Sequence, residues 1–210
     1  MQKTAIILGA TGLTGSCVLE QLLANDDYST VKLFSRKTSN VKHPKVKEFI
    51  GDMLQLEAFQ NDFTGDEVYC CIGTTKKKTP DKEVYRTIDF GIPSTAARMA
   101  KANNIKSFAV VSAIGANSNS SVGYNRIKGD MEKAVMDAEI ERTYIVRPSF
   151  IAGNRQEHRG GEKMGIAVFK FLKPLIPKKY RAVEANDIAQ RMIQLCNSNE
   201  ASKILESNEI

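Results

Sequence analysis

The sequence has little that would suit a membrane span, a metal centre or a disulfide framework. It contains no run of about 18 apolar residues, which a transmembrane helix would need, and its N-terminus shows no small-residue cleavage site of the secretory type. It has only two histidines, and none of its four cysteines forms a C-x-x-C pair, so we expect no metal site. We therefore expect a cytoplasmic protein with reduced thiols and no membrane partner.

The positive charge of the chain is scattered. The formal net charge is +6, and the one tight cationic run, Lys76-Lys77-Lys78, has no interleaved aromatic residues. Because a nucleic-acid groove combines clustered cations with aromatic side chains, we expect no nucleic-acid partner. The run is interpreted as a solvated loop or as a loop beside an anionic cofactor.

Apolar runs alternate with helical patterns along most of the chain. We expect strands at 4–9, 31–36, 46–50, 67–73, 107–112 and 143–148, and helices at 13–24, 82–102, 124–138 and 186–197. Strands that alternate with helices predict an α/β fold, a doubly wound parallel sheet in a single domain over 1–210. Residues 150–182 break the alternation, so we expect them to form a small insertion on this domain.

A glycine-rich turn, IILGATGLTG, joins the first expected strand to the first expected helix. Gly9, Gly12 and Gly15 are spaced as in the dinucleotide-binding fingerprint, and their strand–helix context is the one that the fingerprint requires. The free N–H groups at the helix start attract phosphates, so we expect cofactor contacts at Thr11 and Leu13 as well. The alternative is a glycine-rich connection that serves another ligand.

The end of the second expected strand bears on which dinucleotide is bound. An acidic residue about 20 residues after the glycines would accept a hydrogen bond from the ribose 2′-hydroxyl of NAD(H). The strand instead ends in Ser35-Arg36-Lys37. Arg36 can pair with a 2′-phosphate and Ser35 can donate to it, so the sequence favours NADP(H). The alternative is that Arg36 and Lys37 are ordinary surface charges.

Two further turns lie at the ends of expected strands. Asp52 follows the third strand, where it can hold the edge of the adenine or simply serve as a turn aspartate. Gly73 and Thr74 follow the fourth strand, at the carboxyl edge of the sheet where ligands bind. We expect their backbone and hydroxyl groups to line the phosphate or ribose of the cofactor.

A Y-x-x-x-K pair opens the expected helix at 124–138. A spacing of four residues places Tyr124 and Lys128 side by side on a helix. Chance alone can produce this spacing, as Tyr28 and Lys32 show, but Tyr28 lies in a turn before a strand and nothing places that pair on one face. Ser112 ends the fifth expected strand, twelve residues before Tyr124.

The chemistry of a dehydrogenase suits these three residues. A free tyrosine has a pKa near 10, and we expect the Lys128 ammonium and an oxidised nicotinamide to lower the pKa of Tyr124. Tyr124 would then exchange a proton with a substrate oxygen, Lys128 would also hold the nicotinamide ribose, and Ser112 would orient the substrate oxygen. The alternative for Ser112 is an ordinary serine at a strand end.

Several segments together resemble the atypical short-chain dehydrogenases/reductases, in the NAD(P)H-binding, NmrA-like branch that contains the HIV Tat-interacting-protein-like oxidoreductases. These segments are GATGLTG, CCIGTT, VVSAIGA, YNRIK and IVRPSFIAGNRQE. The resemblance implies a Rossmann fold, NADP(H) binding by Gly9, Gly12, Gly15 and Arg36, and a Ser112–Tyr124–Lys128 triad. It also implies that the insertion lies on the substrate side. Ala113 departs from relatives that carry a second serine there, and no equivalent of the proton-relay asparagine is evident.

The sequence thus predicts an NADP(H)-dependent oxidoreductase. We expect a small-molecule substrate, either a carbonyl or alcohol compound or a sugar-like one as in related epimerases. The alternative is a regulator that senses NADP(H), binds a protein partner and catalyses nothing. The oligomeric state stays open, with a homodimer through the helices that flank the sheet as one arrangement.

Overall fold

The computed structural model describes residues 2–153 and 177–210, so most of the expected insertion, residues 154–176, lies outside the described residues. The main sheet comprises β1 (Lys3–Leu8), β2 (Tyr28–Ser35), β3 (Val46–Ile50), β4 (Glu67–Cys70), β5 (Ser107–Val111), β6 (Arg142–Arg147) and β9 (Lys203–Glu206). The longer helices are α1 (Leu13–Ala24), α3 (Ile92–Ala102), α4 (Gly123–Met136) and α6 (Ala185–Cys196). A 3₁₀ segment, η1 (Met53–Phe59), follows β3.

The strand order is β3-β2-β1-β4-β5-β6-β9, and every neighbouring pair is parallel. The chain starts in the middle of the sheet at β1, runs outward to β3, and returns to β4 before it runs to the other edge. This reversal between β1 and β4 is the switch point at whose carboxyl end ligands bind in such sheets. The predicted doubly wound parallel fold is confirmed.

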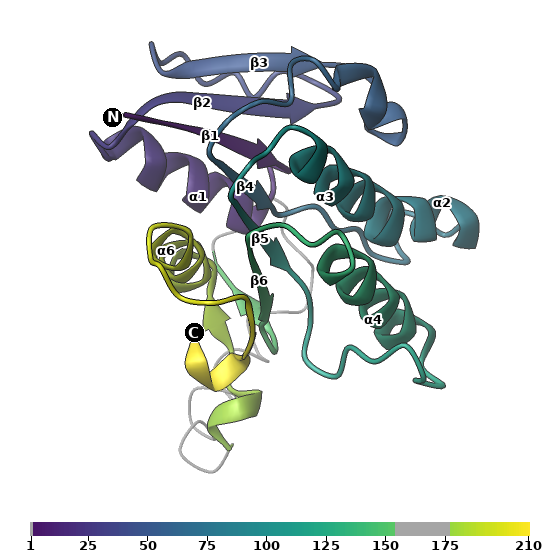
Figure 1. The fold of residues 1–210 in the computed structure, drawn as a ribbon. Helices are drawn as coiled ribbons and strands as arrows, with labels where there is room; N and C mark the ends of the chain where they lie inside the picture. Colours follow the sequence, from purple (N-terminus) through teal and green to yellow (C-terminus); the bar gives the residue numbers. More distant parts are fainter. Residues whose placement is uncertain (1, 154–176) are drawn as a thin grey trace.

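Helices cover both faces of the sheet (Figure 1). Ala5 and Ile7 of β1 belong to the core beneath α1 and α6, whereas Ile6 and Leu8 belong to the core beneath α3 and α4. Side chains alternate along a strand, so a strand that is buried on both faces reads as a continuous apolar run. This is why the central strands were recognisable in the sequence.

The predicted helix over 82–102 is continuous but not regular. α2 (Lys82–Arg86) runs into a π-helical turn, η2 (Thr87–Gly91), and the turn runs into α3. The side chain of Asp81 caps the start of α2 by accepting from the backbone N–H of Glu83 at 2.9 Å. A π turn inserts one extra residue into a helix and is frequent at functional sites. Here Asp89 lies on the turn and is 1% exposed.

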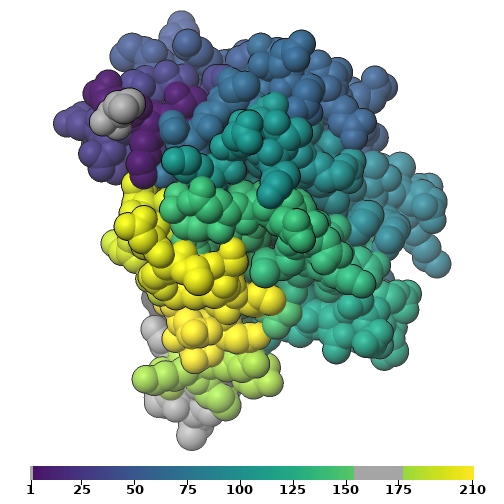
Figure 2. All heavy atoms as spheres, viewed as in Figure 1, coloured from purple at the N-terminus to yellow at the C-terminus, as the bar shows by residue number. Residues whose placement is uncertain are grey.

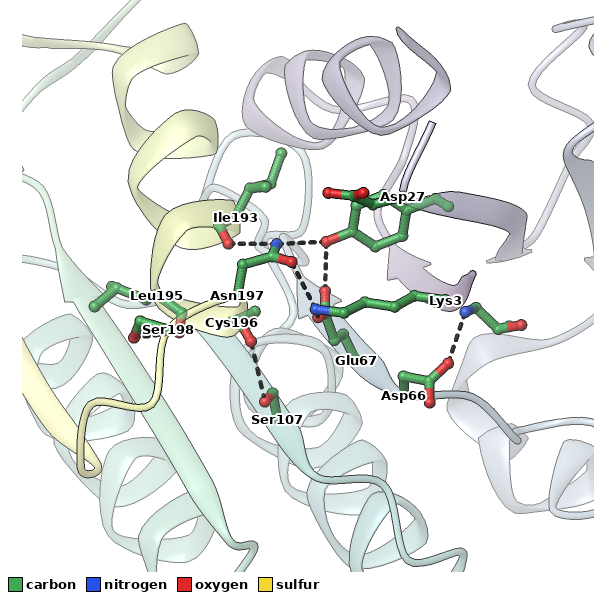
Figure 3. A network of polar contacts seen from close by, with 12 residues as sticks. Lys3, Asp27, Asp66, Glu67, Ser107, Ile193, Leu195, Cys196, Asn197 and Ser198 are labelled. Carbon is green, nitrogen blue, oxygen red and sulfur yellow. Dashed lines mark hydrogen bonds and ion pairs between the residues drawn. The ribbon is translucent and has the colours of Figure 1, made fainter. Parts of the chain in front are cut away.

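A buried polar cluster lies at the amino edge of the sheet (Figure 3). Glu67 accepts hydrogen bonds from the hydroxyls of Tyr28 (2.7 Å) and Tyr69 (2.6 Å) and pairs with Lys3 at 2.6 Å. Asn197, just after α6, donates to the Tyr28 hydroxyl at 2.6 Å and accepts from Lys3 at 2.6 Å. We call these five residues the amino-edge cluster. They tie β1 to the end of α6, and Figure 2 shows C-terminal residues (yellow) against N-terminal ones (purple).

The described part of the insertion forms a small sheet of its own. β7 (Ile151–Ala152) pairs in parallel with β8 (Val183–Glu184), and a short 3₁₀ turn, η4 (Lys178–Tyr180), precedes β8. Over residues 2–153 and 177–210, no helix is long and apolar enough to cross a membrane. Within the same ranges, no three His, Cys, Asp or Glu side chains come together as a metal site would require.

Candidate functional site

The predicted site residues gather along the carboxyl edge of the sheet. Because all strands are parallel, the turns after β1, β2, β3, β4 and β5 open on the same edge. The loop after β6 reaches this edge too, since a Cβ added at Gly153 would lie 2.8 Å from Leu13 Cδ1 in the glycine turn. The segment after β6 therefore lies against the glycine turn at this edge.

The glycine turn is built for close backbone approach. Gly9 has φ +85°, and a Cβ there would lie 2.8 Å from the Cys71 carbonyl oxygen. A Cβ at Gly15 would lie 2.1 Å from the Gly9 carbonyl oxygen, so only glycine lets α1 start so close to β1. Gly12 caps α1 with no side-chain hydrogen bond, and Thr11 beside it is exposed. The first N–H groups of α1 are thus available to an anion.

The end of β2 offers two exposed cations, Arg36 and Lys37. The Ser35 hydroxyl donates to the Lys37 carbonyl oxygen at 2.7 Å, so it folds back onto its own turn. Arg36 is exposed, and its guanidinium has no hydrogen bond or ion pair with any residue in the described ranges. The geometry therefore leaves Arg36, more than Ser35, ready to meet a phosphate.

Asp52 has a structural task in this fold. One of its carboxylate oxygens accepts the Leu54 backbone N–H at 3.0 Å and caps η1. The side chain remains exposed, and the Gly51 N–H donates to the Ser35 carbonyl at 3.0 Å, which fixes this turn beside the end of β2. Asp52 therefore lies where the sequence placed it, but its hydrogen bond fits the alternative of a turn aspartate.

The turn after β4 is connected to the π turn. The Thr74 backbone N–H donates to Asp89 Oδ2 at 2.9 Å, and a Cβ at Gly73 would lie 3.6 Å from Asp89 Oδ1. The Thr74 hydroxyl lies 2.9 Å from that of Thr79. Asp89 was not identified from the sequence, because it belongs to no recognised motif. The only sequence signal is one acid between Ile88 and Phe90 in a largely apolar stretch.

Tyr124 and Lys128 lie one turn apart at the start of α4, as predicted. Lys128 is buried, donates to the Val111 carbonyl oxygen at 3.3 Å, and lies 3.5 Å from Asp89 Oδ1. Tyr124 is 36% exposed, and its hydroxyl has no hydrogen-bond partner in the described part of the chain. The other Y-x-x-x-K pair is excluded, because Tyr28 belongs to the amino-edge cluster at the opposite edge of the sheet.

The expected lowering of the Tyr124 pKa is wrong for the protein without cofactor. Burial raises the pKa of Tyr124 to about 12, and the negative charge of Asp89 adds to this effect. Tyr85, on α2, is close enough to interact with both Asp89 and Tyr124, and burial raises its pKa as well. The Lys128 ammonium, which was expected to favour the phenolate of Tyr124, is paired with Asp89 instead.

The Ser112 side chain contacts Glu132. It is buried, and its hydroxyl donates to Glu132 Oε1 at 2.5 Å. Glu132 in turn accepts from Arg147 Nε at 2.9 Å, and Arg147 Nη1 pairs with Glu206 of β9 at 2.9 Å. No hydrogen bond joins Ser112 to Tyr124 or Lys128 within the described residues, and the Ser112 hydroxyl bonds Glu132. Glu132, four residues after Lys128, was not recognised in the sequence.

The glycine turn and the start of α1, at the carboxyl edge of the sheet, can accommodate a dinucleotide. The glycine turn leaves a cradle that an added Cβ would fill, the start of α1 is uncapped by any side chain, and its first turn holds no acidic residue. An acid there would repel a pyrophosphate, whereas free N–H groups attract it.

Comparisons with known proteins agree with this fit. A family described as NAD(P)H-binding matches residues 9–199. Protein HTATIP2 of Rattus norvegicus is 32% identical over 164 residues, which cover 76% of this chain and 67% of the rat protein. The mitochondrial protein FMP52 of Eremothecium gossypii is 29% identical over 216 residues, which cover 98% of this chain and 95% of the fungal protein.

Solved structures agree on the fold. The Bordetella bronchiseptica enzyme WbmG in complex with NAD superposes with a TM-score of 0.73 at 12% identity, covering 100% of this chain and 74% of that one. The UDP-N-acetylglucosamine 4-epimerase of Methanobrevibacter ruminantium gives 0.73 at 16% identity, with 98% and 76% covered. The match over residues 9–199 shows that the chain belongs to the NAD(P)H-binding family, as an atypical, NmrA-like and HTATIP2-like short-chain dehydrogenase/reductase.

Proposed function

We propose that this protein is an NADP(H)-dependent oxidoreductase that acts on a carbonyl or alcohol substrate, sugar-like ones included. The observation that carries the proposal is the pairing of Tyr124 with Lys128 one turn later, on the edge where the glycine turn opens. Tyr124 is partly exposed and its hydroxyl is unpartnered among the described residues, so it is free to meet a substrate oxygen.

The start of α1 and the turn after β2 would hold the cofactor. The Gly12 N–H donates to the Gly9 carbonyl oxygen at 2.9 Å, so free N–H groups at Leu13 and the residues after it would bind the pyrophosphate, and Arg36 would bind the 2′-phosphate. Gly73 and Thr74 would line the ribose or phosphate. Lys128 would hold the nicotinamide ribose, since its ammonium lies beside the Val111 carbonyl at the carboxyl end of β5.

Tyr124 would move the proton. NADPH supplies a hydride when it is bound, and the phenol of Tyr124 donates a proton to the substrate oxygen. We no longer assign the substrate oxygen to Ser112, because the Ser112 proton is committed to Glu132 at 2.5 Å. Ser112 instead joins the end of β5 to α4, and so supports the helix that carries Tyr124.

A calorimetric titration with NADPH and NADH tests the cofactor assignment. We expect tighter binding of NADPH in the unaltered protein, and a loss of roughly 10–100-fold for NADPH alone in Arg36→Gln, since one charge-assisted contact disappears. Arg98→Gln is the matched control, because Arg98 is exposed on α3 and pairs with Glu57. Equal NADPH affinity in Arg36→Gln and the unaltered protein would contradict the role of Arg36.

A panel of aldehydes, ketones and UDP-sugars tests turnover. UDP-sugars are included because fold relatives bind them, such as MoeE5 in complex with UDP-glucose. We expect NADPH oxidation with a member of the carbonyl part of the panel. If NADPH binds but nothing is reduced, and NADPH changes affinity for a protein partner, the chain is instead a dinucleotide-sensing regulator.

The compartment and the assembly state remain proposals. Fungal relatives are named mitochondrial, which differs from the cytoplasmic location expected from the sequence. Imaging of a C-terminally tagged chain would decide between the two. Sedimentation would test the homodimer, and affinity that falls steeply with salt would reveal the nucleic-acid binding that we do not expect.

A further inference from the structure

Asp89 and Lys128 form a buried ion pair, and its Asp89 charge acts on Tyr124. Asp89 Oδ1 and Lys128 Nζ are 3.5 Å apart, and their side chains are 1% and 4% exposed. The second carboxylate oxygen of Asp89 accepts the Thr74 N–H at 2.9 Å, so Asp89 is fixed from two sides. Burial of a lone ammonium would be costly, and the opposite charge of Asp89 compensates it.

The pair changes what Tyr124 experiences. A lysine one turn away favours a phenolate only if its charge is not already matched. We propose that Asp89 is a positioning residue that neutralises Lys128 and thereby keeps Tyr124 protonated, so that the site works as a proton donor in the direction of carbonyl reduction. This inference rests on the proposed function.

The groups around Tyr124 support the proposal. Tyr85 of α2 and Asp89 of η2 interact with it, Lys128 lies one turn further along α4, and Cys70 at the end of β4 interacts with the Asp89–Lys128 ion pair. Tyr85 is a neutral phenol, and burial raises the pKa of the Cys70 thiol to about 11, so neither adds charge near neutral pH. Burial and Asp89 raise the pKa of Tyr124 to about 12.

The proposed step balances as a reduction. The Oη–H bond of Tyr124 breaks as an O–H bond forms on the carbonyl oxygen. The carbonyl carbon accepts a hydride, with its two electrons, from the reduced dinucleotide, which is oxidised. The phenolate then recovers a proton from water. Oxidation of the alcohol needs the phenolate first, so in this site it is favoured only at high pH.

Tyrosine titration of the cofactor-free protein tests the inference. We would label the chain with ¹³C at the tyrosine Cζ, assign the Tyr124 signal by its loss in Tyr124→Phe, and follow it with pH. In the unaltered protein the signal should show no ionisation up to about pH 11, whereas in Asp89→Asn ionisation should begin about one to three pH units lower. Asn keeps an oxygen that can accept the Thr74 N–H.

Asp130→Asn is the matched control. Asp130 lies on α4 two residues after Lys128, but its carboxylate pairs with Arg86 at 2.9 Å. This variant should titrate like the unaltered protein, so a shift confined to Asp89→Asn identifies the Asp89 charge as its cause. Should Asp89→Asn fail to fold, ionisation of Tyr124 below about pH 9 in the unaltered protein would still overturn the proposal.

Two results would overturn the proposal. One is ionisation of Tyr124 below about pH 9 in the unaltered protein, near or below the ordinary tyrosine value. The other is a Tyr124 signal in folded Asp89→Asn that matches the unaltered protein, because the Asp89 charge would then have no influence on the ionisation of Tyr124. Neither titration needs cofactor or substrate. A failure of NADPH to bind would therefore contradict the proposed function and leave the result of the titrations unchanged.

Discussion

The two edges of the sheet carry polar clusters of opposite character. At the amino edge the Glu67 carboxylate is surrounded by two phenols and Lys3, and Asn197 completes the bonding. At the carboxyl edge Asp89 and Lys128 are paired, but the Tyr124 hydroxyl beside them has no partner in the described ranges. Fully bonded buried groups hold a fold together, whereas a polar group left open is available to a ligand.

The largest effect that separates the edges should come from Tyr124→Phe. Removal of the phenol oxygen takes away the proposed proton donor, so we expect turnover to fall roughly 10²–10⁴-fold. Stability should stay within about 0.5 kcal/mol, since no hydrogen bond is lost. Steady-state kinetics and urea unfolding measure the two quantities. A Tyr124→Phe variant with full activity would contradict the role of Tyr124 as proton donor.

Gly15→Ala should damage the carboxyl edge through the backbone. Its Cβ would lie 2.1 Å from the Gly9 carbonyl oxygen, so α1 must move away from the turn. We expect NADPH affinity to fall by roughly tenfold or more, and stability to fall by about 1–3 kcal/mol. Gly123→Ala is the control at the start of α4, because nothing lies within 4 Å of its added Cβ. Calorimetry and thermal melting should show it unharmed.

Glu67→Gln should disrupt the amino-edge cluster and leave the carboxyl edge of the sheet unchanged. One of the two oxygens becomes an NH₂ group, so a phenol or Lys3 loses its acceptor in a buried place. We expect a loss of about 1–3 kcal/mol in the free energy of unfolding and unchanged NADPH affinity. Urea unfolding and calorimetry check this. A loss of cofactor binding in the folded variant would show that the two edges are coupled.

Ser112→Ala should give the smallest change. The hydroxyl bonds Glu132, which keeps its two bonds to Arg147, so we expect a loss of about 0.5–1.5 kcal/mol in stability. Turnover should change by less than about threefold, because the Ser112 proton does not face the substrate. A fall comparable to that of Tyr124→Phe would restore Ser112 to the catalytic group.

The sequence predicted the features that depend on local pattern. The first three strands, the glycine turn and the Tyr124–Lys128 pair follow from apolar runs and fixed spacings, and all three lie where expected. β9 was missed, because a four-residue strand near the C-terminus is too short for its pattern to stand out. Contacts between residues far apart in the sequence could not be predicted either.

Asp89 shows why the rest of the site was hidden. Its role depends on a π turn, which leaves no mark in the sequence, and on Lys128, which lies 39 residues later. The Ser112–Glu132 bond joins a strand end to a helix 20 residues on. The pKa of Tyr124 was therefore predicted in the wrong direction: spacing identified the lysine but not the carboxylate that pairs with it.

The position of α6 in the chain bears on how this protein is made. α3 and α4 complete one face of the sheet by residue 136, but the other face needs α6, which packs on α1 and ends at Cys196. A nascent chain that lacks these last residues exposes the apolar side of β5 and β6, including Ala109 and Tyr144, to water. Synthesis must therefore proceed beyond α6 before α1 can pack against it, and products truncated before α6 should be prone to aggregation.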